Sequence, residues 1–323
     1  MIRFDRSTVE DLFRDGHFRV LICTATLAWG VNLPAHTVII RGTEVYDPKR
    51  GGLVSISVLD VMQIFGRAGR PQYDTSGHGI IISDIKQVSH YLRLIAHALP
   101  IESTFQSRLS DHLNAEIHAG TVTSIAEGVR WLEYTYLWQR IRINPLSYGL
   151  TIGDVRRDPE LRTIRSEFIS NAAAALNEAC MVRFNPDTGA LDTTDLGRIA
   201  SHYYIEHISI RTFNEHLRRA DGSFVDTLDL GAALNIIASA NEFGQLRARQ
   251  EELDELNKIH QMLPARIRKV RIAMESADET SIQWKVTTLL KAYISRVPID
   301  MHSLVADMNY IVQNGSRIGR ALF

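Results

Sequence analysis

The stretch that decides the fold of the first part of this chain is Val58-Leu-Asp-Val-Met-Gln-Ile-Phe-Gly-Arg-Ala-Gly-Arg-Pro-Gln-Tyr-Asp-Thr-Ser-Gly-His-Gly-Ile-Ile-Ile-Ser83. Its beginning, 58–65, has apolar residues at helical spacing, and its end, 78–83, is a short apolar run typical of a buried strand. The same two kinds of segment recur around it. Helices are expected at 7–15 and 85–98, and strands at 20–23 and 38–40. Helices and strands in alternation predict an α/β unit with parallel strands.

The loop inside this stretch carries two arginines. Arg67 and Arg70 each follow a glycine, Gly66 and Gly69. If this segment is helical or makes one turn, both guanidinium groups point the same way. Two such groups suit a polyphosphate, because each binds oxygens in a bidentate manner and neither loses its proton. The alternative interpretation is a solvated surface that happens to carry two arginines.

A second informative loop, Cys23-Thr-Ala-Thr-Leu-Ala-Trp-Gly-Val-Asn-Leu-Pro-Ala35, lies between the first two expected strands. It contains the hydroxyls of Thr24 and Thr26, a glycine at Gly30 and the amide of Asn32. Loops at the carboxyl ends of parallel strands are where open α/β sheets bind ligands. Hydroxyls and free backbone amides suit phosphate oxygens. An ordinary connection between two strands is the alternative. Cys23, at the end of a strand, is expected to be a small buried residue.

Between the two loops, the segments 39–46 and 53–57 are rich in β-branched residues and flank Asp47-Pro-Lys-Arg-Gly-Gly52. Two such arms around a Pro/Gly turn predict a β-hairpin. Its tip would carry Tyr46, Lys49 and Arg50, an aromatic ring beside two cations. A surface hairpin without contacts is the alternative.

The rest of the chain is predominantly helical. Apolar residues recur at helical spacing from 101 onward, and 178–184, 185–189 and 190–191 read as strand, turn and strand. Helices followed by such a hairpin predict a winged helix. From Thr193 to the end the pattern is helical, with an amphipathic stretch at 243–263 that indicates a solvated helix of a bundle. The expected domains are therefore 1–98, 99–192 and 193–323.

Composition places the chain among globular proteins without a membrane span. Of its 323 residues, 45% are hydrophobic and 23% charged, and the formal net charge is −1. No apolar run reaches the roughly 18–20 residues that a spanning helix needs. Two cysteines argue against a disulfide scaffold and fit a reducing compartment. The scattered histidines show no spacing suited to a metal. The charge balance is not that of a basic protein, so local cations such as Arg317 and Arg320, at helical spacing, are the better guide to nucleic acid.

Together the two loops resemble motifs V and VI of superfamily-two helicases of the Ski-type DExH-box branch. Shorter stretches agree with the same family: Asn114-Ala-Glu-Ile117, Asn144-Pro-Leu-Ser-Tyr-Gly149, Asp195-Leu-Gly-Arg-Ile-Ala-Ser-His-Tyr-Tyr204 and Gln313-Asn-Gly-Ser-Arg-Ile-Gly-Arg-Ala-Leu-Phe323. The resemblance runs nearly end to end and is weakest at about 220–290. It implies part of a second RecA-like domain, then a winged helix, then the start of a helical bundle.

The resemblance also implies site residues. ATP with Mg²⁺ would bind between two RecA-like domains, with Arg67 and Arg70 as arginine fingers and Gln63 placing the nucleotide or the water. Gly66 belongs to the same nucleotide loop, and Gly30 and Asn32 would link it to the strand-binding loop. The residues expected to contact a nucleic-acid strand are Thr24, Thr26, Tyr46, Lys49, Arg50, Arg317 and Arg320.

Two motifs that ATP hydrolysis requires are missing from the sequence, and this limits the expected activity. Neither a Gly-x-x-x-x-Gly-Lys-Ser/Thr loop nor an Asp-Glu-x-His box occurs in it. We therefore expect a piece of a longer ATP-dependent 3′–5′ helicase that is inactive alone. The implied partners are single-stranded or junction DNA or RNA and subunits of a larger nuclear or ribosome-associated complex, without a membrane. The expected location is the nucleus and the cytoplasm. The alternative is a non-catalytic docking module in which the winged helix and the bundle bind partner proteins.

Overall fold

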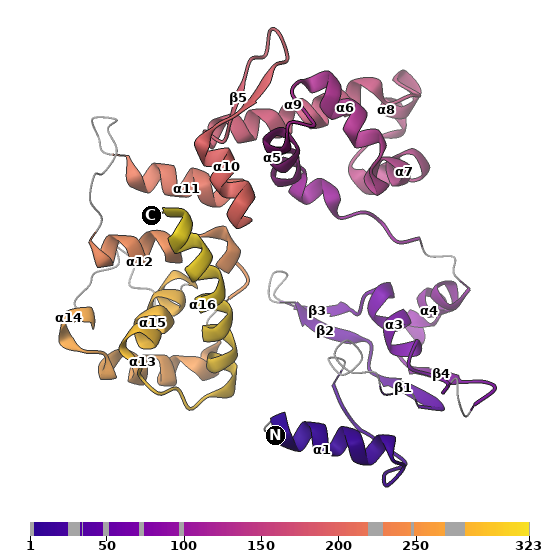
Figure 1. Ribbon diagram of the computed structural model, residues 1–323. Helices are drawn as coiled ribbons and strands as arrows, with labels where there is room; N and C mark the ends of the chain where they lie inside the picture. The colour runs from indigo at the N-terminus through magenta and orange to yellow at the C-terminus, as the bar shows by residue number, and fades with distance from the viewer. Residues whose placement is uncertain are drawn as a thin grey trace. The chain divides into compact units, whose positions relative to one another are not determined.

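The computed structural model describes residues 3–24, 33, 35–47, 52–70, 74–96, 100–218, 229–246, 249–268 and 282–322. The chain forms two compact units, Met1–Ile101 and Glu102–Phe323, which are described separately below (Figure 1). In the described part of the chain, no helix is both long and apolar enough to span a membrane.

The first unit is an α/β unit. Its helices and strands are α1 (Arg3–Arg14), β1 (Thr37–Arg41), β2 (Glu44–Asp47), β3 (Gly52–Ser55), α3 (Val58–Phe65), β4 (His78–Ile82), the short 3₁₀ turn η1 (Ile85–Gln87) and α4 (Val88–Ile95). Strands β1 and β4 pair in parallel, with Ile39 opposite Ile80. The expected parallel pairing and the helix at 58–65 are confirmed.

The small parallel sheet is covered on one face. Ile40 of β1 is buried in a cluster with Val61 of α3 and Tyr91 and Leu94 of α4. The side chains at alternate positions, on the other face, are solvent-exposed: Ile39 is 56% exposed, and Ile80 and Ile82 are 43% and 55% exposed.

The strand expected at 20–23 is wrong for this structure. Residues Val20 to Cys23 form no strand, Val20 and Ile22 are 77% and 92% exposed, and Cys23 is exposed rather than buried. A strand needs a neighbour to take up its backbone N–H and C=O groups. In the described part of this unit, β1 has β4 as its only sheet partner, so the segment at 20–23 has no ladder to join.

The predicted hairpin is confirmed. Strands β2 and β3 pair antiparallel, with Tyr46 opposite Leu53. A capped helix follows directly. The side chain of Ser57 accepts a hydrogen bond from the Asp60 N–H at 3.1 Å, which satisfies one of the open amides at the start of α3.

The second unit begins as a winged helix. Its elements are η2 (Phe105–Arg108), α5 (Leu109–Ala119), α6 (Ile125–Glu133), α7 (Tyr136–Ile143), η3 (Pro145–Tyr148), α8 (Ile152–Arg157), α9 (Arg162–Glu178), β5 (Val182–Phe184), β6 (Leu191–Thr193) and α10 (Asp195–Tyr203). Strands β5 and β6 pair antiparallel around a turn closed by Gly189 at φ +70°. The expected hairpin after a set of helices is confirmed (Figure 1).

Helices continue to the end of the described chain. They are α11 (His207–Leu217), α12 (Leu230–Ala238), η4 (Asn241–Phe243), η5 (Gln250–Glu252), α13 (Leu253–Met262), α14 (Ala265–Arg268), α15 (Ile282–Ser295) and α16 (His302–Leu322). The amphipathic stretch at 243–263 is not one helix: it contains two short turns before α13 begins at Leu253. Buried residues from Leu109 to Ile318 form one hydrophobic cluster, so the winged helix and the bundle share a core.

The centre of the bundle holds a buried ion network. Lys285 of α15 is 1% exposed and donates to Glu252 and to Asp307 of α16, both at 2.6 Å. Glu252 also accepts from the Ser303 hydroxyl at 3.0 Å. A buried cation is tolerated only when it is paired in this way, so the network fixes how α13, α15 and α16 meet.

Candidate nucleotide and nucleic-acid site

The loop after α3 carries the two arginines of the sequence motif. Helix α3 ends at Gly66, whose N–H bonds back to the carbonyls of Met62 and Ile64. Two further short bonds follow, Arg67 N to Ile64 O at 3.1 Å and Ala68 N to Phe65 O at 2.8 Å. The chain therefore leaves the helix in a tight turn, and Arg67 stands at the beginning of this turn.

The same loop is bonded to the segment that precedes β1. Ala35 and Ala68 form a parallel bridge, in which the Ala35 N–H donates to Arg67 O at 2.9 Å and the Gly69 N–H donates to Ala35 O at 2.7 Å. The end of the first sequence loop is thus joined to the arginine loop by backbone hydrogen bonds.

Two glycines allow this close approach. Gly69 has φ +90°, a conformation that side chains with a Cβ rarely adopt. A Cβ on Gly77 would lie 2.6 Å from backbone atoms of Ala68 and Gly69. The strand β4 can begin beside the arginine loop only because this position has no side chain.

Arg70 holds a carboxylate. Its Nε and Nη2 donate to the two oxygens of Asp74 at 2.8 Å and 3.0 Å, and the Arg70 N–H donates to the same side chain at 3.1 Å. The Arg70 side chain is 46% exposed, whereas that of Asp74 is 9% exposed. The hydrogen bond from Arg70 lowers the pKa of Asp74 below its usual value. The guanidinium therefore already binds an anion in the bidentate geometry that a phosphoryl group would use.

The other residues expected at the nucleotide site are placed as follows. Arg67 is half-buried, and Gln63 is exposed on α3 one turn before it. Gly30 and Asn32 lie outside the described residues. Arg67 and Arg70 are the side chains of this loop that could bind the outer phosphate of a nucleotide. No cluster of metal-ligating side chains occurs among the described residues.

Two of the expected strand-binding residues of this unit lie among the described residues. Thr24 is exposed at the start of the first loop, and Tyr46 belongs to β2. Thr26, Lys49 and Arg50 lie outside the described residues. Their roles stay predictions.

Arg317 and Arg320 of α16 differ in their surroundings. The Arg317 guanidinium donates to the carbonyls of Tyr203 at 3.2 Å and Tyr204 at 2.6 Å, and also to Asn314 Oδ1 at 2.7 Å and 3.1 Å. It therefore caps the end of α10 instead of facing outward, because those carbonyls have no partner within their own helix. Arg320 is exposed.

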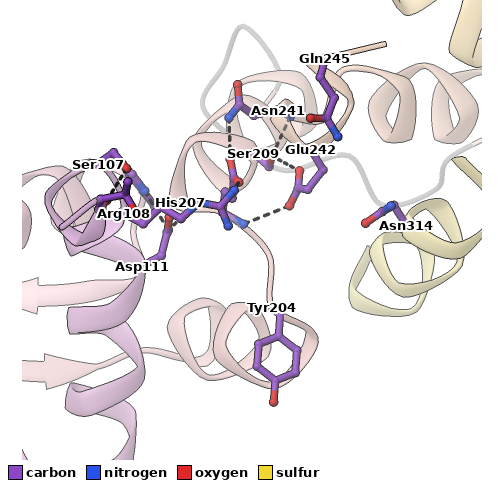
Figure 2. A network of polar contacts seen from close by, with 12 residues as sticks. Ser107, Arg108, Asp111, Tyr204, His207, Ser209, Asn241, Glu242, Gln245 and Asn314 are labelled. Atoms are coloured by element: carbon purple, nitrogen blue, oxygen red, sulfur yellow. Dashed lines mark hydrogen bonds and ion pairs between the residues drawn. The ribbon is translucent and has the colours of Figure 1, made fainter. Parts of the chain in front are cut away.

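A polar network connects the winged helix to the bundle near this point (Figure 2). Asp111 of α5 accepts from the His207 N–H at 2.7 Å and lies 2.9 Å from His207 Nδ1. Glu242 accepts from the Ser209 hydroxyl at 2.5 Å and from the Glu206 N–H at 3.0 Å, so it satisfies the start of α11. The network fixes the turn between α10 and α11.

Two features of the site were not found from the sequence. The pairing of Asp74 with Arg70 was missed, although its spacing of four residues within the quoted stretch is a signal for such a pair. The capping role of Arg317 joins residues 113 and 114 positions apart, and no local pattern indicates it.

Comparison with known families divides the chain into three matched regions. The helicase conserved C-terminal domain matches residues 1–72, a winged helix-turn-helix domain matches 102–184, and the Sec63 Brl domain matches 193–323.

Individual relatives match over the whole chain. The chain is 48% identical over 323 residues to activating signal cointegrator 1 complex subunit 3 of Dictyostelium discoideum. It is 45% identical to the DExH-box ATP-dependent RNA helicase DExH14 of Arabidopsis thaliana and 45% identical to the U5 small nuclear ribonucleoprotein 200 kDa helicase of Drosophila melanogaster. In each case all of this chain is covered, and it spans 14% of the length of the relative. By these matches and by its partial RecA-like unit, winged helix and helical bundle, the chain belongs to the Ski-type DExH-box family of superfamily-two helicases.

Proposed function

We propose that this chain is the part of an ATP-dependent 3′–5′ helicase that supplies arginine fingers to the nucleotide and contacts to the translocated strand. The observation that carries the proposal is the arginine loop, which lies in the region matched by the helicase conserved C-terminal domain and is bonded through Ala35 to the first sequence loop. In this proposal Arg70 exchanges the Asp74 carboxylate for a phosphoryl group.

In this proposal Arg67 and Arg70 stabilise the negative charge that develops on a transferring phosphoryl group. Bound ATP with Mg²⁺ supplies that group, and the phosphate loop and acidic box that hold it come from a separate domain. Gln63, Gly66, Gly30 and Asn32 belong to the same nucleotide face. The chain alone does not hydrolyse ATP, because it contains neither of those two motifs.

The strand contacts are assigned to Thr24 and Thr26 in the first loop and to Tyr46, Lys49 and Arg50 on the hairpin. Arg320 lies on the exposed side of α16 and can reach a phosphate. Arg317 contributes by holding the end of α10 in place. The relatives carry the names of subunits of the activating signal cointegrator 1 complex and of a small nuclear ribonucleoprotein. By analogy we assign this chain to a large nuclear complex that acts on RNA or DNA, with a cytoplasmic pool as a further expectation.

The test is directional unwinding by a full-length protein that contains this chain. A duplex with a 3′ single-stranded tail is expected to be unwound in the presence of ATP and Mg²⁺, and the same duplex with a 5′ tail is expected to stay paired. If neither duplex is unwound and ATP is not hydrolysed while partner proteins are still bound, the docking-module alternative is correct and the helicase proposal is wrong.

A further inference from the structure

Tyr204 has a backbone conformation that is unusual for its residue type. It ends α10 with φ +55° and ψ +48°, in the left-handed region. The N–H groups of Tyr204 and Ile205 both donate to the carbonyl of Ala200. Glycine or asparagine normally occupies this position at a helix end, because a bulky residue there suffers steric crowding.

Burial explains such a conformation at Leu161 but not at Tyr204, nor at Arg296, which is exposed with φ +55°. Leu161 also has a positive φ, of +52°, and its side chain is 3% exposed within the core. The aromatic side chain of Tyr204 is 81% exposed. Packing therefore compensates for the strain at Leu161, whereas the Tyr204 ring gains little from the fold. Strain without packing is a reason to look for a binding role.

The turn that carries Tyr204 is held firmly. Arg317 of α16 donates to the carbonyl of Tyr204 at 2.6 Å, and Asn314 orients that guanidinium at 2.7 Å. Glu206, two residues further, accepts from the Asn241 amide at 2.5 Å. Figure 2 shows the Tyr204 ring pointing away from the contacts that join Asp111, His207, Ser209 and Glu242. The ring is thus presented outward from a fixed point.

The elements that meet at this turn carry polar and cationic side chains. The Arg108 side chain is 66% exposed and pairs with Glu206 at 3.2 Å, and His202 and Arg320 are exposed on α10 and α16. Single-stranded nucleic acid is bound by this combination, an aromatic ring for a base and cations for the backbone. A protein partner is more often bound by a contiguous apolar patch around the aromatic anchor.

We propose that Tyr204 is a stacking residue that binds a base of single-stranded nucleic acid at the junction of the winged helix and the bundle. This rests on the proposed function, because it takes a nucleic-acid strand as the ligand. It adds a contact on the second unit that is separate from the loops of the first unit.

The test uses the 323-residue chain, a fluorescein-labelled single-stranded oligonucleotide and fluorescence anisotropy at one fixed, low salt concentration. Tyr204→Asn is expected to weaken binding by roughly 5- to 150-fold, since stacking of one base is worth about 1–3 kcal/mol. Tyr204→Trp is expected to bind within about twofold of the wild type, because it keeps an aromatic face. Tyr134→Asn is the matched control. Tyr134 is 91% exposed at the end of α6 with φ −84°, so its replacement should leave the affinity unchanged.

Thermal unfolding separates loss of contact from loss of fold. Asparagine tolerates the left-handed conformation, so Tyr204→Asn should keep or raise the Tm. A lower Tm would mean that the ring stabilises the fold, and the inference would be wrong. Equal affinity of wild type and Tyr204→Asn, or an equal loss in Tyr134→Asn, would overturn the inference and leave the helicase proposal intact. A wild-type chain that binds no strand would contradict the strand contacts in the proposed function itself.

Discussion

At the scale of single residues, the most informative contact is the one between Arg70 and Asp74. Both carboxylate oxygens are bound, and the arginine is charged throughout the accessible pH range. A phosphoryl group offers the same pair of oxygens with more negative charge, so it can compete for the guanidinium. In the proposed function, the pairing orients the Arg70 side chain before a nucleotide binds, and this would reduce the conformational cost of binding.

Glu102 is a second residue with concentrated hydrogen bonding. It accepts from Arg140 at 2.9 Å and 3.2 Å, from the Asn144 amide at 2.8 Å and from the Tyr148 hydroxyl at 2.7 Å. The hydrogen bond from Arg140 is the main reason that the pKa of Glu102 is lowered to about 2, and Asn144 and Tyr148 lower it further. Burial of the carboxylate acts in the opposite direction.

This shift predicts a pH-dependent stability. Because the pKa of Glu102 is about 2 in the folded chain and 4.5 in its ordinary state, its contribution is complete above about pH 5 and is lost as the pH falls toward 2. The urea midpoint of wild type should therefore exceed that of Glu102→Gln at pH 7, and the difference should shrink between pH 5 and pH 3. Glu160→Gln is the control, since Glu160 is 68% exposed and pairs only at the surface with Arg162. A difference that stays constant with pH would contradict the assignment.

At the scale of elements, the packing of α10 depends on one small residue. A Cβ on Gly197 would lie 2.1 Å from the carbonyl oxygen of Met181 and 2.8 Å from Asn114 Oδ1. The Asn114 amide donates to Gly197 O at 2.9 Å, so α5 and α10 are in direct contact at this glycine. Met181 directly precedes β5, so the start of the β5–β6 hairpin and the helices α5 and α10 meet at this glycine.

Gly197→Ala should therefore destabilise the second unit by about 1–3 kcal/mol or more, because the backbone must move to admit a methyl group. Gly153→Ala is the matched control within a helix of the same unit. A Cβ there meets only the Thr151 hydroxyl at 3.5 Å, and replacing a helical glycine should stabilise by about 0.5–1 kcal/mol. Chemical denaturation measures both, and an unchanged midpoint for Gly197→Ala would show that α10 packs differently.

Elements were predictable where the sequence pattern is local. The helix at 58–65, the strand at 78–82 and both hairpins follow from apolar spacing and from turn residues. The segment at 20–23 has the composition of a strand, yet it forms none, because strand formation depends on neighbours outside the local sequence. The stretch at 243–263 has helical periodicity throughout, but α13 begins only at Leu253, after η4, which ends at Phe243, and η5. Glu242 of η4, just before the stretch, accepts from the Glu206 N–H at the start of α11.

At the scale of the whole molecule, the family and the position of the arginine loop could be predicted from the sequence, whereas the contacts could not. Arg67 and Arg70 were identified because the motif is contiguous. The capping contacts of Arg317 and the role proposed for Tyr204 depend on α16 meeting the end of α10, a contact over more than a hundred residues. The near-neutral charge of the chain says little about nucleic-acid binding, because in the proposed function that binding depends on a few local cations.

The central claim is that the arginine loop belongs to an ATPase site. The most direct test is ATP hydrolysis by a full-length protein that contains this chain, with Arg70→Ala compared with wild type and with Arg14→Ala. Arg14 is an exposed arginine of the same unit that also pairs with a carboxylate, Asp11, at 2.6 Å. The account predicts a loss of about 10³–10⁵ in the rate for Arg70→Ala, with ATP binding largely retained, and no change for Arg14→Ala. Hydrolysis by Arg70→Ala within tenfold of wild type would contradict it.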